Sequence, residues 1–281
     1  GLFGSGLNKP LAGGFASLVK YINQSPATVV SIDVPSGLMT EDNTYNVRAN
    51  IIRADVTLTL QNIKLSFLFP ENQKLIGRLK VLDIRLSKEG MDVVPSHYSM
   101  LEENELRPRL LHRGAFVHKG DMGNALIIAG SYGMAGAAVL ATKACLRSGA
   151  GKVTVCTPRR NNDIMQVSVP EAVMCVGKDD AYFSEAVDSS GFDAVGIGPG
   201  LGRQEASAIA LITQIRRTQA PIVIDADGLN MHASHRAWLQ QLPKGKILTT
   251  HPKECERLAG SHFGGSYKGL SGARARAESL R

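Results

Sequence analysis

The segment from residue 118 to residue 155 constrains the fold of this chain more than any other. It contains a short apolar run, a glycine-rich turn, a stretch of small residues, a second glycine turn and another apolar run. The first run, Ala125–Ala129, has the length and composition of a buried parallel strand. After the turn at residues 130–133, four apolar positions recur at helical spacing and predict one face of a helix: Ala137, Leu140, Ala141 and Ala144.

This predicted helix opens with Gly136-Ala137-Ala138, so no side chain blocks the backbone N–H groups of its first turn. Those N–H groups and the helix dipole favour an anion. A glycine loop also suits a close-packed junction between a strand and a helix that binds nothing. Two interpretations therefore stay open, a phosphate- or nucleotide-accepting corner and a packing junction.

At 281 residues the chain is long enough for two domains or one large α/β domain. It has no apolar run near the ~18 residues of a membrane helix, and no signal-peptide pattern at its start. The net charge of +7 suits an anionic small molecule, but aromatic residues do not interleave with the basic ones as nucleic-acid binding requires. We predict no membrane and no nucleic-acid partner. Because the chain begins without Met in a loop-like stretch, we also expect its N-terminal part to be missing.

Four cysteines are scattered along the chain: Cys145, Cys156, Cys175 and Cys255. None forms a Cys-x-x-Cys pair, so the spacing gives little support to a zinc site or a dithiol redox motif. Reduced thiols in a cytoplasmic protein are the simplest account.

An alternation of strands and helices runs through the rest of the chain. Predicted strands lie at residues 28–34, 54–60, 80–84, 125–129, 152–156, 193–197, 221–225 and 246–250. Two further helix faces are marked by Phe15, Leu18, Val19 and Ile22, and by Ala208, Leu211, Ile212 and Ile215. Residues 85–117 lack this rhythm and predict a domain junction. The pattern favours mainly parallel sheets covered on both faces, with ligands beyond the carboxyl ends of the strands.

Two motifs that follow predicted strands suit ligand binding. In Asp33-Val34-Pro35-Ser36-Gly37, the carboxylate can act as a base and the hydroxyl as a cation ligand, although a simple turn fits equally. In Gly198-Pro199-Gly200-Leu201-Gly202, three glycines allow a ligand, or a tight turn, close to the backbone.

Two more strand ends carry ionisable side chains. Asp225-Ala226-Asp227-Gly228 resembles a calcium loop, but its glycine is misplaced and no Glu lies twelve residues in, which favours a polar network instead. His251 follows the last predicted strand, where a histidine either binds a ligand, acts as an acid or base, or has a structural role.

Taken together and in this order, the motifs resemble those of the bifunctional NAD(P)H-hydrate repair enzymes. The second half is similar to their dehydratase domain on HKGDMG at 118–123, GSYGMAGAA at 130–138, RSGAGKV at 147–153, GIGPGLG at 196–202, IDADGLN at 224–230 and TTHPKE at 249–254. The first half is similar to their epimerase domain on LFGSGL at 2–7, SIDVPSG at 31–37, and ADVTLTL at 54–60 with Lys64.

The resemblance implies an α/β protein with two three-layer αβα domains. Residues 1–100 would be part of a Rossmann-like epimerase domain and residues 101–281 part of a ribokinase-like dehydratase domain. The epimerase, an isomerase, interconverts the R and S hydrates of NADH and NADPH. The dehydratase, a lyase, phosphorylates the hydroxyl of the S hydrate with ADP, or with ATP in many eukaryotic versions, and then eliminates phosphate. Implied cofactors are ADP or ATP, potassium and magnesium, and implied partners are the hydrated cofactor and further copies of the chain.

Site residues carry over by position. The implied epimerase substrate loop is Gly4, Ser5, Gly6, Leu7, Asn8, Lys9 and Pro10. Asp33 would contact the hydrate as the candidate proton-transfer base, and Ser36 would help to hold potassium. In the dehydratase half, the residues that would contact the hydrated nicotinamide nucleotide are Ala137, Gly200, Gly202 and His251.

The sequence departs from the family in two places. It has no asparagine- and glycine-rich loop with a metal-binding aspartate before LFGSGL, and no Gly-Thr-Gly-Asp motif, which supplies the anion hole and the catalytic aspartate in the family. We therefore expect a fragment in which neither active site is complete. The alternatives are a ribokinase-type small-molecule kinase and a nucleotide-binding module without catalysis.

Overall fold

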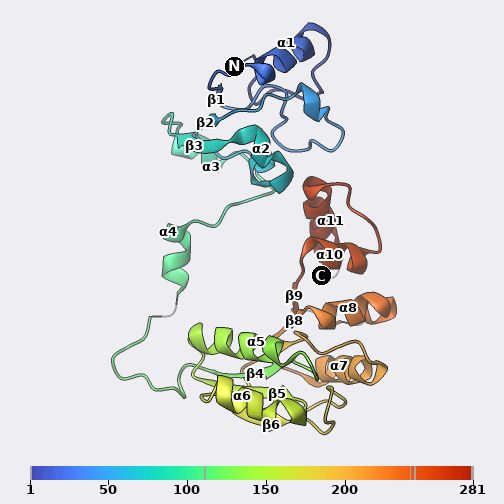
Figure 1. Ribbon diagram of the computed structural model, residues 1–281. Helices are drawn as coiled ribbons and strands as arrows, with labels where there is room; N and C mark the ends of the chain where they lie inside the picture. The colour runs from blue at the N-terminus through green and yellow to red at the C-terminus, as the bar shows by residue number, and fades with distance from the viewer. Residues whose placement is uncertain (1, 111, 241, 244, 280–281) are drawn as a thin grey trace. The chain divides into compact units, whose positions relative to one another are not determined.

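A computed structural model describes residues 2–110, 112–240, 242–243 and 245–279 (Figure 1). The chain divides into two compact units, Gly1–Leu110 with Phe263–Gly272, and Leu111–His262 with Ala273–Arg281. Each unit contains one sheet, and every strand pair in both sheets is parallel. The predicted α/β fold with parallel sheets is therefore confirmed. No helix in the described ranges is long and apolar enough to cross a membrane.

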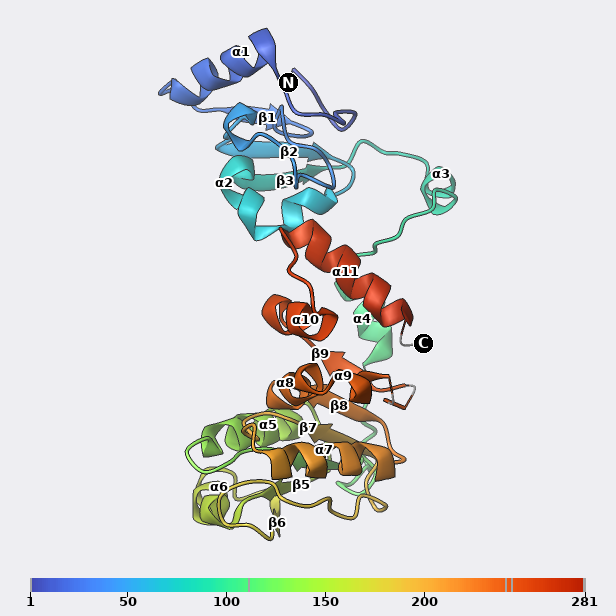
Figure 2. The ribbon, with the colours of Figure 1, turned by 90° about the vertical axis from the view of Figure 1, so that its right-hand side faces the viewer.

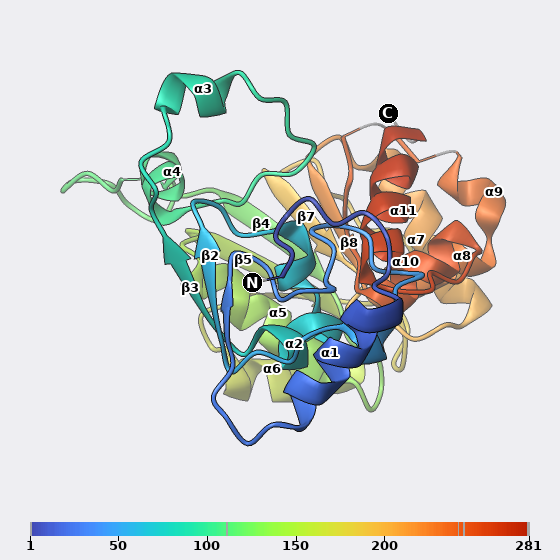
Figure 3. The ribbon, with the colours of Figure 1, turned by 90° about the horizontal axis from the view of Figure 1, so that it is seen from above.

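The first unit is built on three strands in the order β1-β2-β3, which Figure 3 shows side by side. They are β1 (Val30–Ile32), β2 (Val56–Leu60) and β3 (Arg78–Leu82). The helices are α1 (Gly13–Gln24), α2 (Gln73–Ile76), α3 (Lys88–Asp92) and α4 (Glu103–Leu106). Thr57 on the central strand is fully buried, and its hydroxyl donates a hydrogen bond of 2.7 Å to the carbonyl of Ile76. This bond ties the end of α2 to the sheet.

The second unit has six strands in the order β6-β5-β4-β7-β8-β9. They are β4 (Asn124–Ile128), β5 (Lys152–Thr157), β6 (Val173–Val176), β7 (Ala194–Ile197), β8 (Ile222–Asp225) and β9 (Ile247–Thr249). The chain proceeds outward from β4 to one edge and then outward from β7 to the other, so the strand order reverses between these two. Such a reversal leaves a crevice at the carboxyl ends of the two central strands, where open parallel sheets bind ligands.

Helices cover both faces of this second sheet and can be followed in Figure 2. Side chains of α5 (Ala135–Arg147) and α6 (Asn162–Ser168) pack on one face, and those of α7 (Glu205–Arg217) and α8 (Asp227–Ser234) on the other. The remaining helices are α9 (Arg236–Leu239), α10 (Pro252–Ala259) and α11 (Ser266–Ser279), of which α11 belongs to the first unit as far as Gly272. Leu126 and Ile128 of β4 face one helical layer while Ile127 faces the other, which is why this strand is apolar from Ala125 onward.

One of the three predicted helix faces is correct in full. All four marked residues of α7, from Ala208 to Ile215, are buried. On α5 the predicted helix is present and its predicted face is wrong in part. Ala141 packs on the core, but Leu140 is 71% exposed, and Ala138 and Thr142 are fully buried instead. The small residues of this helix lie on several of its sides. Their spacing in the sequence therefore does not identify the side that packs on the sheet.

The predicted face of α1 is wrong in part. Val19 is fully buried, but Phe15 is 51% and Leu18 is 40% exposed. Ala16 is the second buried residue of this helix, and its small side chain lets α1 pack closely without using the larger apolar residues.

Candidate functional site

Asp33 lies directly after β1 and is held by an ion pair. Its φ of +66° is left-handed, a conformation that few residues other than glycine adopt. Lys64 Nζ lies 2.9 Å from Asp33 Oδ1, and each of the two side chains is 15% exposed. Lys64 Nζ also donates to the carbonyls of Leu60 and Asn62, at 2.9 and 3.0 Å. The ammonium group is therefore fixed in place by three oxygen atoms.

The surroundings of Asp33 keep its carboxyl group ionised. Burial by itself raises the pKa of Asp33, but hydrogen bonds from Lys64 and from the N–H of Leu60, the charge of Lys64 and the N–H of Ser5 hold the pKa below its ordinary value of 3.8. Such a carboxylate is a weak base and a strong hydrogen-bond acceptor. Sequence reasoning noted Lys64 but did not pair it with Asp33. The available signal was that both residues follow neighbouring strands.

The structure brings the start of the predicted substrate loop to Asp33. Besides the hydrogen bond from Ser5, a Cβ atom added to Gly4 would lie 3.4 Å from Asp33 Oδ2. Farther along the loop, Leu7 packs on the apolar cluster that α1 covers, and Asn8 and Lys9 are exposed. Gly4 and Ser5 are thus the part of the loop that lies at the carboxylate.

Ser36 is buried, and its hydroxyl is already engaged. Ser36 Oγ accepts hydrogen bonds from the N–H groups of Leu2 and Phe3, at 3.0 and 3.1 Å, and it donates one to the carbonyl of Phe3 at 3.3 Å. A hydroxyl has two acceptor lone pairs, so both are used. As it lies, Ser36 Oγ does not fit a potassium ligand. It holds the residues before the substrate loop against the turn after β1.

In the second unit, the glycine corner after β4 meets the glycine loop after β7, where the strand order reverses. Gly130 N donates a hydrogen bond of 2.8 Å to the carbonyl of Pro199. Gly200 has a φ of +65°, and a Cβ atom there would lie only 2.7 Å from the Cβ of Ala137 and 3.2 Å from the carbonyl oxygen of Met134. Only glycine permits this approach. Ala137 and Gly200, both predicted to bind the hydrated nucleotide, are therefore neighbours.

The rest of the glycine loop is anchored to β8 and α8. Gly198 has a φ of +130°, and a Cβ atom there would lie 1.9 Å from the carbonyl oxygen of Asp225. Gly202 N donates a 3.0 Å hydrogen bond to Asp227 Oδ2, and Arg203 Nε lies 3.6 Å from Asp227 Oδ1. Asp227 thus has the polar-network role expected for it. Within the described residues, no three or more His, Cys, Asp and Glu side chains are grouped to hold a metal ion.

The corner beside α5 is suited to a negative charge. Met134, the residue at the N-terminal cap of α5, makes no side-chain capping bond, so its side chain does not satisfy the backbone N–H groups at the end of the helix where the dipole favours an anion. The guanidinium carbon of Arg160 lies 4.9 Å from the centre of the Tyr132 ring, which places a positive charge at the glycine turn. Sequence reasoning missed this pair, because nothing local links the two residues.

His251 has a clear structural task at the start of α10. Its Nδ1 accepts a hydrogen bond of 3.1 Å from Lys253 N, and its Nε2 lies 3.4 Å from Glu254 Oε1. Glu254 Oε2 in turn accepts from the N–H of His251 at 3.1 Å, which completes a capping box. These contacts support the structural alternative. The predicted ligand contact of His251 stays a prediction, and it would use the exposed part of the ring.

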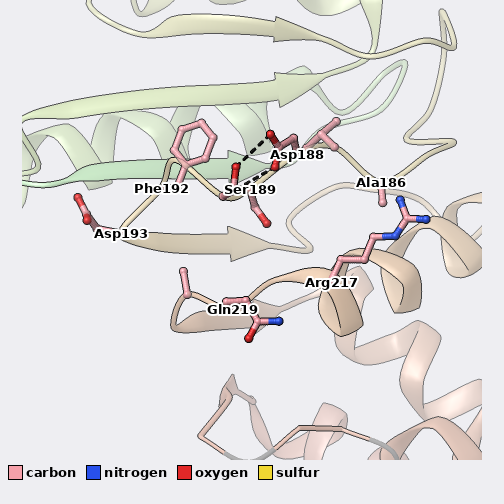
Figure 4. Close-up of a pocket in the computed structure, with 10 residues that line it drawn as sticks. Ala186, Asp188, Ser189, Phe192, Asp193, Arg217 and Gln219 are labelled. Carbon is pink, nitrogen blue, oxygen red and sulfur yellow. Dashed lines mark hydrogen bonds between the residues drawn. The ribbon is translucent and has the colours of Figure 1, made fainter.

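A pocket of about 530 Å³ lies at the opposite end of the strands of the same sheet, next to the amino ends of β7 and β8 (Figure 4). Its lining includes Asp188, Ser189, Asp193, Arg217 and Gln219. Both oxygens of Asp188 accept hydrogen bonds from Ser190. Because sheets of this kind bind ligands beyond the carboxyl ends, the pocket is not part of the candidate site.

Comparison with known proteins finds two family matches in different parts of the chain. The sequence profile of the family described as NAD(P)H-hydrate dehydratase matches residues 125–279, and that of the YjeF-related protein N-terminus matches residues 1–66. The bifunctional NAD(P)H-hydrate repair enzyme Nnr of Moorella thermoacetica is 33% identical over 92% of this chain and 50% of its own length. The enzyme of the same name from Vibrio cholerae is 34% identical over 92% of this chain and 51% of its own length. The chain thus spans about half the length of the curated relatives it matches.

Two solved structures share the fold of the second unit's family. An ADP/ATP-dependent NAD(P)H-hydrate dehydratase from Bacillus subtilis, crystallised with ATP and Mg²⁺, is 30% identical with a TM-score of 0.50. The match covers 63% of this chain and 60% of the other. A hypothetical protein from Streptococcus mutans is 28% identical with a TM-score of 0.51, over 64% of this chain and 63% of that one.

Proposed function

The chain belongs to the family of bifunctional NAD(P)H-hydrate repair enzymes, and on this basis we propose that it carries parts of two repair activities. Residues 1–100 contribute to epimerisation of the R and S hydrates of NADH and NADPH. Residues 101–281 contribute to ADP-dependent dehydration of the S hydrate. The proposal includes a cytoplasmic location and assembly of several copies of the chain.

The contact of the two glycine loops between β4 and β7 is the observation that carries the dehydratase part. It lies at the strand-order reversal, where a ligand crevice is expected, and it joins Ala137 to Gly200. Backbone groups without large side chains let a flat ring and its phosphates approach closely. We propose that these residues and Gly202 bind the hydrated nicotinamide nucleotide, while Asp227 holds the loop in shape.

The bound ADP or ATP supplies the phosphoryl group that turns the hydrate hydroxyl into a good leaving group. Mg²⁺ is usually coordinated by substrate phosphates and only one or two protein carboxylates. In this proposal it would therefore bind together with the nucleotide. The chain's own contribution is to orient the nicotinamide ring. Asp227, which is tied to Gly202, keeps the loop in place during that step.

In the epimerase part we propose that the ionised Asp33 accepts a hydrogen bond or a proton from the hydrate. Its lowered pKa means that a proton taken up at neutral pH is passed on rather than held. Lys64 keeps the carboxylate in place and balances its charge. A potassium ion at Ser36 remains a proposal that requires the Ser36 hydroxyl to release the N–H groups of Leu2 and Phe3.

Calorimetric titration of the chain with hydrated NADH tests the binding site. We expect binding by the unchanged protein and its loss in Gly200→Val, because the new side chain would collide with Ala137 and Met134. Gly191→Ala is the matched control, since nothing lies within 4 Å of a Cβ atom there and Gly191 precedes β7, at the end of the strand away from the glycine loop. Equal binding by all three proteins would exclude the glycine loop as the substrate site.

Catalysis is tested by adding ADP and following the absorbance of reduced nicotinamide. The sequence contains no Gly-Thr-Gly-Asp stretch, so we expect binding without recovery of the cofactor. Recovery by the purified chain would contradict this expectation and show that the catalytic group lies within these 281 residues.

A further inference from the structure

Two of the four cysteines, far apart in the sequence, are register partners on neighbouring strands. Cys156 of β5 pairs with Cys175 of β6. Neighbouring strands lie about 4.8 Å apart, and disulfides span Cα distances of roughly 4.4–6.8 Å. Both side chains point to the same face of the sheet, where Cys175 packs against the apolar cluster that contains Cys156. All four cysteines of the chain are free thiols in this structure.

The two thiols differ in a way that suits stepwise chemistry. Cys156 is 1% exposed, whereas Cys175 lies on the edge strand and is only partly buried. The Cys156 thiol donates a hydrogen bond to the Cys175 sulfur, which lowers the pKa of Cys175 although burial opposes this. The same hydrogen bond, together with burial, raises the pKa of Cys156. Cys175 is therefore the accessible nucleophile and Cys156 the protected thiol beside it.

We propose that Cys156 and Cys175 form a reversible disulfide, and that this pair is a redox-sensitive modification site of the second unit. The inference stands on the register and burial of the two strands and does not depend on the proposed repair activity.

The oxidant we propose is a low-molecular-weight disulfide of the glutathione class. The Cys175 thiolate attacks one sulfur of this disulfide, its S–S bond breaks, and the first small thiolate leaves and takes up a proton. Cys156 then loses its proton to solvent and attacks the Cys175 sulfur of the mixed disulfide, which expels the second small thiolate. Two protein thiols are thereby oxidised to one disulfide, and one small disulfide is reduced to two thiols.

The end of β5 connects this pair to the glycine corner. The carbonyl of Cys156 accepts the N–H of Ala129 at 3.1 Å. The next residue, Thr157, places its Oγ1 where a Cβ atom added to Gly130 would lie 3.0 Å away. An S–S bond of about 2.05 Å draws the two strands closer than a thiol hydrogen bond does. We expect this movement to reach Gly130.

The test is to treat the reduced, folded chain with oxidised glutathione, block remaining thiols with iodoacetamide, and map its peptides by mass spectrometry. We expect a peptide that links Cys156 to Cys175 as the main product. Cys145→Ser and Cys255→Ser are matched controls that should keep this link. In Cys156→Ala we expect glutathione to stay attached to Cys175, because the resolving thiol is missing.

Several results would overturn the proposal. These are a stable glutathione adduct on Cys175 in the unchanged protein, alkylation of both cysteines after oxidation, or a link that forms only in urea. Should Cys156→Ala not fold, Cys175→Ser gives the same decision, because its Cys156 should then stay a free thiol. Hydrogen exchange of the Gly130 amide should differ between the reduced and the linked protein, and identical exchange would exclude the coupling to the corner.

Discussion

The two units differ in the kind of contact that lies at the carboxyl ends of their strands. In the first unit the ion pair of Asp33 and Lys64 is also hydrogen-bonded to backbone groups: N–H groups donate to Asp33, and Lys64 donates to carbonyls. In the second unit the loops after β4 and β7 approach so closely that glycines replace side chains at the contact. The first arrangement should therefore respond to charge and pH, and the second to added volume. Four substitutions test that contrast, beginning with the largest expected effect.

Gly198→Ala should have the largest effect. A Cβ atom would lie 1.9 Å from the Asp225 carbonyl, and the φ of +130° is unfavourable for alanine. We expect the free energy of unfolding of the second unit to fall by about 3 kcal/mol or more. Urea unfolding followed by fluorescence of the only tryptophan, Trp238, reports on this unit. Gly136→Ala, which has open space around the new methyl group, should not destabilise the unit. Equal stability of the two variants would contradict the close approach.

Lys64→Met should mainly change the titration of Asp33. Without the ammonium group the pKa of Asp33 should rise, and the first unit should lose about 2 kcal/mol because a carboxylate that is 15% exposed is left unpaired. Carbon-13 NMR of the Asp33 carboxyl measures the midpoint, which should lie below 3.8 in the unchanged protein. Lys74→Met is the control, and a common midpoint for all three proteins would exclude the ion pair.

The lowered pKa of Asp33 also predicts a pH dependence. Because the folded value lies below the ordinary 3.8, the carboxylate stabilises the fold fully above pH 3.8 and loses this effect as the pH falls through the folded value. The stability difference between the unchanged protein and Lys64→Met should therefore shrink in that window. A difference that stays constant with pH would mean that the pair contributes by packing alone.

His251→Ala should cost about 1 kcal/mol, the usual value for a lost N-cap. Amide hydrogen exchange in α10 should speed up accordingly. His251→Ser keeps a capping oxygen but no imidazole, so it should restore slow exchange. If the serine variant also binds hydrated NADH as before, His251 is a helix cap alone and its predicted ligand contact is wrong.

Leu140→Gln should have the smallest effect, within about 0.5 kcal/mol, because this side chain is 71% exposed. Ala138→Gln at the fully buried position of the same helix is the contrasting variant and should destabilise the second unit strongly. The Trp238 unfolding assay compares them. A large loss from Leu140→Gln would restore the helix face predicted from the sequence.

Much of the fold followed from local patterns. Eight predicted strands lie within a few residues of observed ones, because β-branched runs bounded by glycine and proline carry a strong signal. The edge strand β6 was not predicted, since Val173–Val176 is a short run without alternation. On α5 the small residues gave no preferred side, so the predicted face included Leu140, which is exposed, and left out Thr142, which is buried.

The candidate site was predicted as separate motifs rather than as an arrangement. Gly200 and Ala137 were both named, but their contact depends on β4 and β7 being neighbours, which is not a local property. Asp33 and Lys64 meet because β1 and β2 are parallel partners. The Cys156–Cys175 pair depends on register in the same way, and for that reason their spacing in the sequence suggested isolated thiols.

The reversal of strand order has a consequence for how the second unit is made. On one side Ala125 of β4 pairs with Val153 of β5, which follows soon in the chain. On the other side it pairs with Ala194 of β7, which is made much later. A ribosome that adds ~5–20 residues per second needs several seconds to synthesise the roughly 70 residues between them. During this interval the apolar strand β4 has one edge without a partner on the nascent chain. Chaperone capture and misassembly should therefore concentrate at this stage of translation.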